Sequence, residues 1–331
     1  MTRFIGSVRG LRPHECGHDK PLRRPLDVNS TTPKLTVLIP CKDERRNIRP
    51  SIESVRPVAD EILVADSGST DGTLEIVRRI GICRVIRREY VSYGNFLNWA
   101  IPQAENDWVL VVDADERVTP SLAAEIRDVL RHGPARDGYW IRRANHFLGH
   151  RIRFSGWQTD RVLRLFRRDL AHYPGPGYHG RTAIASGDVG RLRGRLLHYP
   201  YWSYDEYFRK FHGYTLRQAK RWHEEGRRAG LSGLLASGPL RFLRDYVLRL
   251  GFLDGRAGLQ VCALAGFYSF MKRARLWEMS HALPQPLPEA EDRVLPSIAE
   301  DRDGEEGGDG EGRGGEAIRR GHGRGPRELS V

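Results

Sequence analysis

Short apolar runs alternate with helix-forming segments along the first third of this chain, and this alternation is what most constrains its fold. Four runs rich in β-branched residues have the length and composition of buried strands. They are Leu35–Pro40, Glu61–Ala65, Cys83–Ile86 and Trp108–Val112. Helix-type segments lie between them, around residues 51–55, 74–80 and 95–101. Strands that alternate with helices favour a largely parallel sheet covered on both faces, so the sequence predicts a doubly wound α/β fold.

Acidic residues follow these runs at their carboxyl ends. Asp113-Ala114-Asp115 comes directly after the fourth run, and Asp66 ends the second. Ligands of open α/β sheets bind at this end of the strands. Two carboxylates one residue apart repel each other unless a cation lies nearby, and oxygen ligands suit Mg²⁺ or Mn²⁺. The pair therefore predicts a divalent cation that would neutralise a diphosphate. The alternative is a polar strand-to-helix turn in which an Asp caps the helix.

The charge of the chain indicates an anionic partner. Its 331 residues carry a formal net charge of +12, mostly from arginine, and the mean hydropathy is −0.54. Such a balance favours nucleic acid, a membrane surface or a phosphorylated substrate. The four cysteines lack disulfide or zinc spacing, which makes a reducing cytoplasm the default location. No stretch reaches the ~18–20 apolar residues of a membrane span, and no signal peptide is visible. Any membrane contact is expected to be peripheral.

Composition divides the chain into four regions. Residues 1–33 are rich in Pro and Arg, and residues 284–331 are a charged, Gly-rich tail. Neither composition can bury a core, so we expect both regions to be disordered. Residues 34–199 are expected to form the α/β domain. Residues 200–283 interleave aromatic side chains and arginines at helical spacing. This pattern predicts amphipathic helices that pack against the sheet domain, lie on an anionic membrane surface, or do both.

The motifs at the strand ends resemble family-2 glycosyltransferases. Their three N-terminal signatures match Val37–Glu44, Asp66–Thr73 and Asp113–Glu116. Two later blocks, Gly156–Arg168 and Leu250–Gly258, resemble the subgroup that contains the lipopolysaccharide-core β-glucosyltransferases of Gram-negative bacteria. The resemblance covers roughly residues 34–280, with the motifs in the family's order. It implies a GT-A fold and an inverting hexosyltransferase that depends on a nucleotide sugar.

The resemblance also implies roles for individual acids. Asp66 is expected to meet the nucleobase, Asp113 the ribose and base, and Asp115 the metal on the diphosphate. A carboxylate reads a base N–H or ribose hydroxyls well because it only accepts hydrogen bonds. For Asp66 the alternative is a helix cap, and one side chain can do both. Glu44 is expected beside the nucleotide pocket, with capping of the first helix as its alternative.

Two further residues, Asn98 and His179, are expected to take part in nucleotide-sugar binding, with His179 contacting the metal or the diphosphate. The chain departs from the family next to both of them. Leu97 stands where relatives usually carry a basic residue, and Gly180 stands where they often carry an acid. These departures leave open how the diphosphate is neutralised. Candidates to compensate are Arg161, Arg164 and Arg181.

Asp160 is the expected general base. An inverting transfer is a single in-line displacement at the anomeric carbon, and the acceptor hydroxyl must lose a proton as it attacks. Asp160 stands just before the strand pattern Val162–Phe166 and resembles the acid motif that these enzymes carry after the metal-binding motif. The alternative is a structural salt bridge to Arg161 or Arg164.

Together these features predict a cytoplasmic enzyme, peripheral at the inner face of the cytoplasmic membrane, that uses Mg²⁺ or Mn²⁺. The expected donor is UDP-glucose or a close relative, and the expected acceptor is a lipopolysaccharide-core or other lipid-linked glycan. One alternative is transfer to polyprenyl phosphate, against which Asp160 argues mildly, because an anionic acceptor hardly needs a base.

Two other classes of protein compete with this interpretation. A nucleic-acid-binding protein fits the charge, but no recognised binding module is present, and acidic strand ends would repel phosphates without a metal. We therefore expect no nucleic-acid partner. A catalytically degenerate protein that binds nucleotide without turnover is the other class, and the departures at Leu97 and Gly180 keep it open.

Overall fold

The structure is a computed structural model that describes residues 32–174 and 182–281. The terminal regions expected at 1–33 and 284–331 lie almost entirely outside these residues, and His179 lies outside them too. The disorder expected for the two termini and the role expected for His179 therefore stay predictions.

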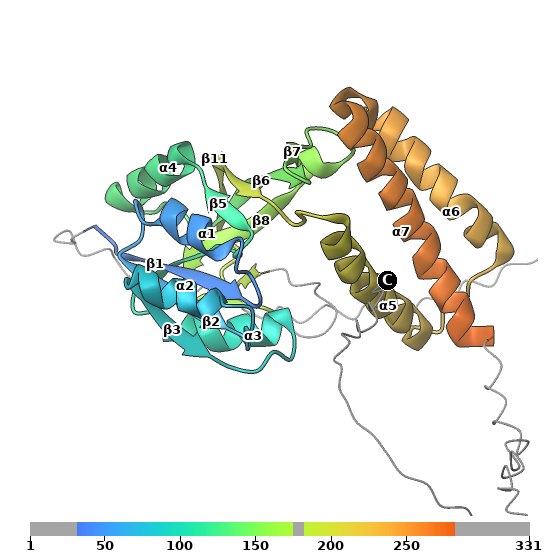
Figure 1. The fold of residues 1–331 in the computed structure, drawn as a ribbon. Helices are drawn as coiled ribbons and strands as arrows, with labels where there is room; N and C mark the ends of the chain where they lie inside the picture. The colour runs from blue at the N-terminus through green and yellow to red at the C-terminus, as the bar shows by residue number, and fades with distance from the viewer. Residues whose placement is uncertain (1–31, 175–181, 282–331) are drawn as a thin grey trace, which may run out of the picture. The chain divides into compact units, whose positions relative to one another are not determined.

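A mixed nine-stranded sheet forms the centre of the first part of the chain (Figure 1). Its order is β3-β2-β1-β4-β8-β6-β11-β5, with β7 paired to β6. The bounds are β1 Leu35–Cys41, β2 Glu61–Asp66, β3 Cys83–Arg87, β4 Trp108–Val111, β5 Glu116–Val118, β6 Gly138–Phe147, β7 His150–Arg151, β8 Arg161–Arg167 and β11 Val189–His198. Strands β1 to β4 are parallel neighbours, as predicted. Strand β8 runs antiparallel to both β4 and β6, while β11 is parallel to β6 and antiparallel to β5.

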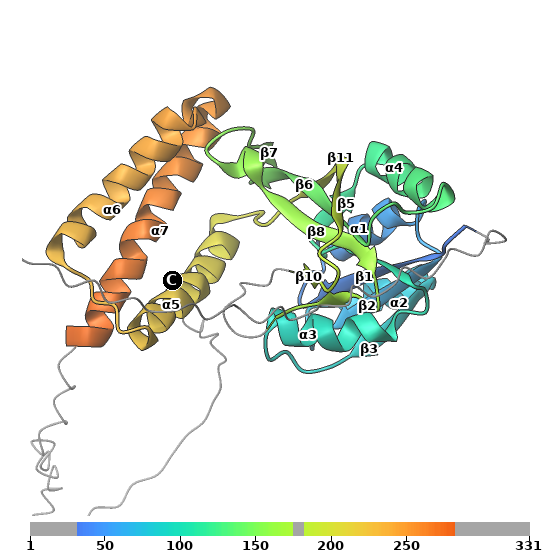
Figure 2. The ribbon, with the colours of Figure 1, turned by 180° about the vertical axis from the view of Figure 1, so that it is seen from behind.

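Helices cover both faces of this sheet (Figures 1 and 2). One face packs against α1 Ile48–Val55, α2 Thr73–Ile80 and α4 Pro120–Arg131. The other packs against α3 Tyr93–Ala100, its 3₁₀ extension η1 Ile101–Gln103, and the small hairpin of β9 Ala171–His172 and β10 Ala183–Ile184. Successive side chains of a strand point to opposite faces. Val37 and Ile39 therefore join the first core and Leu38 the second. The predicted doubly wound α/β class is confirmed.

Leu97 belongs to the second core. It lies on α3 and is fully buried together with Phe96 and Ala100. At the position where relatives usually carry a cation, this chain therefore has a packing residue that cannot reach a ligand.

The C-terminal part is helical, as predicted. It comprises α5 Tyr204–Glu224, α6 Leu231–Leu243, the π-helical turn η3 Arg244–Leu248, the 3₁₀ turn η4 Gly251–Asp254 and α7 Gly255–His281. The backbones of α6 and α7 approach each other closely at two glycines. A Cβ added at Gly266 would lie only 2.9 Å from the carbonyl oxygen of Gly238. Helix α5 joins α7 through Phe211 and Phe267, whose rings stack at 5.2 Å. Within residues 32–174 and 182–281, no helix combines the length and apolar character needed to cross a membrane.

Candidate active site

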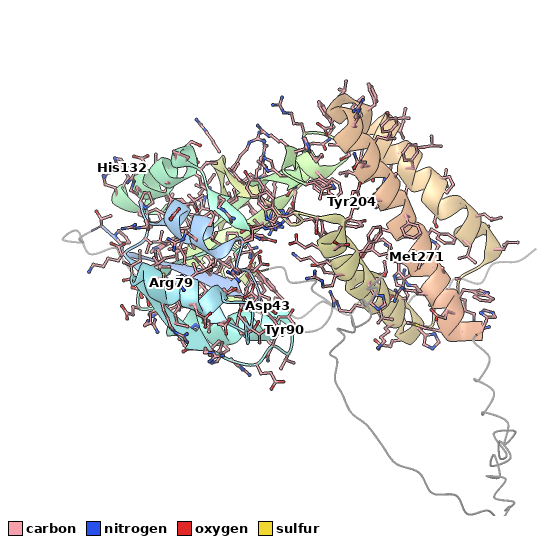
Figure 3. The ribbon with its side chains drawn as sticks, viewed as in Figure 1. Asp43, Arg79, Tyr90, His132, Tyr204 and Met271 are labelled. Atoms are coloured by element: carbon pink, nitrogen blue, oxygen red, sulfur yellow. The ribbon has the colours of Figure 1, made fainter. Side chains whose placement is uncertain are left out.

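The carboxyl ends of β1, β2 and β4 meet beside a pocket of about 440 Å³. Cys41, the last residue of β1, is level with Asp66 at the end of β2, and the amide of Val112 donates to the carbonyl of Leu38. Figure 3 shows Asp43 and Tyr90 at this end of the sheet, whereas Arg79 and His132 lie away from it. The predicted convergence of strand-end residues is therefore present.

Three of the predicted site residues line this pocket. They are Glu44, Asp113 and Asp115. Aromatic side chains from and around α3 add an apolar wall, namely Tyr90, Tyr93 and Phe96. Another wall comes from β6, the end of β11, the segment after β11 and α5, and it includes Arg143, His198, Pro200, Tyr201, Lys210 and Tyr214. A largely apolar wall with a few convergent polar groups is the usual make-up of a ligand site.

Asp113 is held at the pocket wall by three donors. The Tyr93 hydroxyl donates to Oδ1 at 2.7 Å, and the guanidinium groups of Arg143 (3.2 Å) and Arg164 donate to Oδ2. Burial raises the pKa of the Asp113 carboxyl, while the two arginines act in the opposite direction. These contacts fix the position of Asp113, with 22% of its side chain exposed.

Glu116 lies behind Asp113 and is fully buried. Its carboxylate accepts from Arg143 Nε at 2.6 Å and from the Asp113 amide at 3.0 Å. Burial alone would raise the pKa of Glu116, but Arg143 and Arg164 outweigh it and lower that pKa to about 2. Glu116 is therefore an ionised counter-ion that orients both guanidinium groups, out of reach of a substrate.

Asp115 and Glu44 form an acidic pair at the pocket. Burial and the nearby charge of Asp115 raise the pKa of Glu44 to about 7. The Glu44 side chain accepts from Asn47 Nδ2 at 2.7 Å and makes no hydrogen bond to the amides of the first turn of α1. Asp115 lies near two basic side chains, with His198 Nε2 at 3.7 Å and Lys210 Nζ at 3.8 Å. Carboxylates arranged in this way gain from a cation, because it relieves their mutual repulsion.

Asn145 joins His198 to the predicted base. This buried amide donates from Nδ2 to Asp160 Oδ2 at 3.0 Å and to the Trp157 carbonyl at 3.3 Å. A carboxylate and a carbonyl only accept, so Asn145 Oδ1 must face His198 Nδ1, 2.6 Å away. Nδ1 therefore carries a proton and donates to Asn145, and Nε2 is the ring atom that faces Asp115. Metal-binding histidines are typically held in this way.

Asp160 directly precedes β8, as predicted, with about a third of its side chain exposed. Its ion pair is with Arg143, whose Nη1 lies 3.7 Å from Oδ2, and not with the arginines considered from the sequence. Asp160 is not among the residues that line the pocket, whereas Arg143 is. Arg143 also binds Asp113 and Glu116, so it connects the predicted base to the acidic strand end.

The remaining predicted residues make structural contacts. Asp66 is fully buried and accepts from the amides of Gly68 and Ser69 at 3.0 and 3.2 Å, which orders the loop after β2. The Asn98 amide binds the backbone of Tyr173 at both ends, at 2.9 and 2.8 Å. Neither residue lines the pocket, so their nucleotide-binding roles stay predictions.

Four residues of the site were not predicted from the sequence, and the sequence pattern marks only one of them as a candidate. His198 ends the alternating strand β11 and so carries the same strand-end signal as Asp66. Asn145, Arg143 and Lys210 carry no such signal, since a polar residue inside a strand or helix is ordinary. Only long-range pairing brings Arg143 and Lys210 to the pocket, and Asn145 to His198 and Asp160. Within the described ranges, no three His, Cys, Asp or Glu side chains lie close enough together to hold a metal ion by themselves.

Comparisons with known proteins agree with this geometry. The family model for glycosyl transferase family 2 matches residues 36–186. The lipopolysaccharide core biosynthesis glycosyltransferase LpsC of Rhizobium meliloti is 29% identical over 262 residues, which cover 75% of this chain and 93% of LpsC. Glycosyltransferase RT0209 of Rickettsia typhi is 26% identical over 257 residues, which cover 75% of this chain and 88% of that protein.

Among solved structures, the mannosyltransferase PcManGT of Pyrobaculum calidifontis, in complex with GDP-Man and Mn²⁺, aligns with a TM-score of 0.46 and 16% identity. The alignment covers 78% of this chain and 92% of PcManGT. The matched family segment spans β1 to β10 and thus holds the strand-end acids, Asp113 and Asp115 among them. Residues 36–186 therefore form a glycosyl transferase family 2 domain, and the chain is a glycosyltransferase.

Proposed function

We propose that this enzyme is an inverting transferase that moves a sugar, glucose by expectation, from a nucleotide diphosphate sugar to a lipopolysaccharide-core or other lipid-linked glycan. The observation that carries the proposal is the position of Asp113 and Asp115 at the carboxyl end of β4, with His198 Nε2 facing Asp115. The acceptor class is supported by the name of LpsC, a lipopolysaccharide core biosynthesis glycosyltransferase. The similarity to this chain covers 93% of LpsC.

The donor side of the pocket fits a divalent cation shared with the substrate. Asp115 and His198 would hold Mg²⁺ or Mn²⁺, since they offer a carboxylate oxygen and an imidazole lone pair. Few protein ligands suffice at such a site, because the substrate phosphates and water fill the other positions. When bound, the cation neutralises the charge of the departing diphosphate.

On the acceptor side, Asp160 takes the proton. The acceptor oxygen bonds to the anomeric carbon as the bond from that carbon to the diphosphate oxygen breaks, and the hydroxyl proton moves to the carboxylate. Among the described contacts of Asp160, those with Asn145 and Arg143 both fall on Oδ2. Oδ1 is thus left to accept the proton. A positioned base favours a neutral hydroxyl as the acceptor over an anionic polyprenyl phosphate.

The proposal is tested by a screen of donors and acceptors. Purified enzyme with Mn²⁺ or Mg²⁺ is given UDP-glucose, UDP-GlcNAc and GDP-mannose, each with and without a lipopolysaccharide-core acceptor. We expect acceptor-dependent release of nucleoside diphosphate with one donor and inversion at the anomeric carbon, read by NMR. Nucleotide binding without any release would favour the degenerate protein, and no binding at all would contradict the proposal.

We further propose that the helical region binds an anionic membrane surface, as a lipid-linked acceptor requires. Helix α6 buries none of its residues, and four of its leucines are more than half exposed, namely Leu231, Leu235, Leu240 and Leu243. An apolar groove between α6 and α7 continues this surface. Three arginines lie at the end of α6 and just after it, namely Arg241, Arg244 and Arg249. All three form ion pairs with one buried carboxylate, that of Asp245. Apolar side chains flanked by excess positive charge suit anionic lipid.

Sedimentation with vesicles tests the membrane surface. Vesicles of phosphatidylcholine with phosphatidylglycerol should bind the wild type, and the combined changes Leu231→Gln and Leu235→Gln should weaken binding. Ile82→Gln is the matched control, because Ile82 is also exposed (46%) but lies between α2 and β3. Equal binding by all three proteins would contradict this surface.

A further inference from the structure

We propose that α5 completes the donor site and that its Lys210 binds the diphosphate of the nucleotide sugar. This inference rests on the proposed function, and it names a binding residue outside the segment that matches the family, 36–186. It also answers how the chain neutralises a diphosphate with Leu97 buried in the core.

The ammonium group of Lys210 lies beside the expected cation site. Nζ is 3.8 Å from Asp115 Oδ2, donates to the Pro200 carbonyl at 3.0 Å and lies 5.6 Å from the centre of the Tyr201 ring. The side chain is 38% exposed and lines the pocket together with Tyr201 and Tyr214. An ammonium carries three donors. One is used by Pro200, so others remain for phosphate oxygens.

The neighbouring cations are already committed. Arg164 is 4% exposed and binds Asp113 and the Tyr93 hydroxyl. Arg143 divides its guanidinium between Asp113, Glu116 and Asp160. Lys42 also lines the pocket, but it is exposed, and among the described residues it forms no ion pair with Asp115. Lys210 is therefore the lysine of this pocket placed nearest the metal-binding carboxylate.

A cation at the position of Lys210 would stabilise the charge that develops on the diphosphate during transfer. Cleavage of the bond between the anomeric carbon and the diphosphate oxygen leaves the electron pair on the diphosphate, so its negative charge grows as the sugar departs. A fixed cation at that point stabilises the transition state more than the ground state.

Calorimetric titration of UDP and UMP in the presence of Mn²⁺ tests the assignment. Lys210→Met keeps an unbranched side chain of similar length and removes the charge. We expect roughly a tenfold loss of UDP affinity, as for a lost charged hydrogen bond, and little change for UMP, which lacks the second phosphate. Lys210→Arg should restore most of the UDP affinity. Lys220→Met is the matched control, because Lys220 is an exposed lysine on the same helix.

Each other outcome is decisive. Unchanged UDP affinity in Lys210→Met would overturn the assignment and leave the proposed function intact. Equal losses for UDP and UMP, or the same loss in Lys220→Met, would show a structural effect and overturn it as well. Failure of the wild type to bind either UDP or GDP with Mn²⁺ would overturn the proposed function together with this inference.

Discussion

At the scale of single residues, the pocket is organised by the way charges are distributed among neighbours. Arg143 and Arg164 hold Asp113 and the buried Glu116, whereas Asp115 and Glu44 face the pocket with less compensation. Arginine-bound carboxylates are fixed in place, while carboxylates that lack such partners are the ones that bind a cation. The predictions at this scale follow from that division.

Asp115→Asn should abolish sugar transfer while leaving the fold intact, since the side chain is partly exposed at the pocket. The neutral amide is a weak ligand for a divalent cation, so Mn²⁺ should no longer stabilise the variant against thermal unfolding. A chelator should likewise stop wild-type turnover, and added Mn²⁺ or Mg²⁺ should restore it. Full activity in excess chelator would remove the metal from the reaction.

Asp160→Asn should preserve nucleotide-sugar binding and lower the transfer rate by about 10²–10⁴-fold, the usual contribution of a general base. The amide keeps the shape of the side chain and removes its capacity to accept the proton. Calorimetry with UDP and single-turnover transfer assays separate the two effects. Wild-type transfer by this variant would exclude Asp160 as the base, and Glu116 would not replace it, because Glu116 is fully buried.

Glu44 gives the stability of the metal-free enzyme a pH dependence. Its pKa is raised from 4.5 to about 7 by burial and by Asp115, so the folded state holds a proton that the unfolded chain has already lost. Stability should therefore fall as pH rises from about 4.5 to about 7 and then level off. Thermal unfolding of the wild type and Glu44→Gln across this range measures the effect. The variant should lose less stability over the same interval, and parallel curves would contradict the prediction.

At the scale of elements, the strand–helix alternation up to β4 could be read from sequence because each element carries its own periodicity. The two faces of β1 show this, with Val37 in one core and Leu38 in the other. The antiparallel insertion of β8 between β4 and β6 could not be predicted, since it depends on pairing between residues 19–59 positions apart. For the same reason the sequence indicated Asp160 but not Asn145, whose role exists only once β6 and β11 lie side by side.

The contact between β11 and α4 offers a test at this scale. A Cβ at Gly194 would lie 2.6 Å from the Cα of Leu122, so a side chain there must push the helix away from the sheet. Gly194→Ala should destabilise the enzyme by about 1–3 kcal/mol, as overpacking does. Gly230→Ala is the control, because Gly230 has no atom within 4 Å of the added Cβ. Chemical denaturation measures the free energy of unfolding of both variants. Equal values for the two would contradict the prediction, because they would show that α4 can shift without loss of stability.

At the scale of the whole molecule, the proposed donor site and the proposed membrane surface both use the C-terminal helices. Helix α5 contributes Lys210 and Tyr214 to the pocket, and α6 exposes its leucines. A chain that ends at residue 199 should therefore lose both nucleotide affinity and vesicle binding, whereas a chain that ends at residue 283 should keep both.

Salt should weaken vesicle binding by the wild type, because exposed charges are screened over about 8 Å at physiological ionic strength.

Sedimentation and UDP titration of the two truncated chains test the shared role. A chain that ends at residue 199 and still binds UDP like the wild type, while remaining folded by circular dichroism, would contradict the contribution of α5.

The hydrogen bond from Trp202 Nε1 to Asn47 Oδ1 joins residues 155 positions apart at 2.9 Å. It lies between the first helix of the sheet domain and the segment that leads into α5. During synthesis, the strands and helices up to β10 leave the ribosome well before this bond, or the pocket wall of Tyr201 and Lys210, can form. We therefore expect a nucleotide to stabilise the nascent chain only after α5 has left the ribosome, so that earlier folding relies on the sheet core.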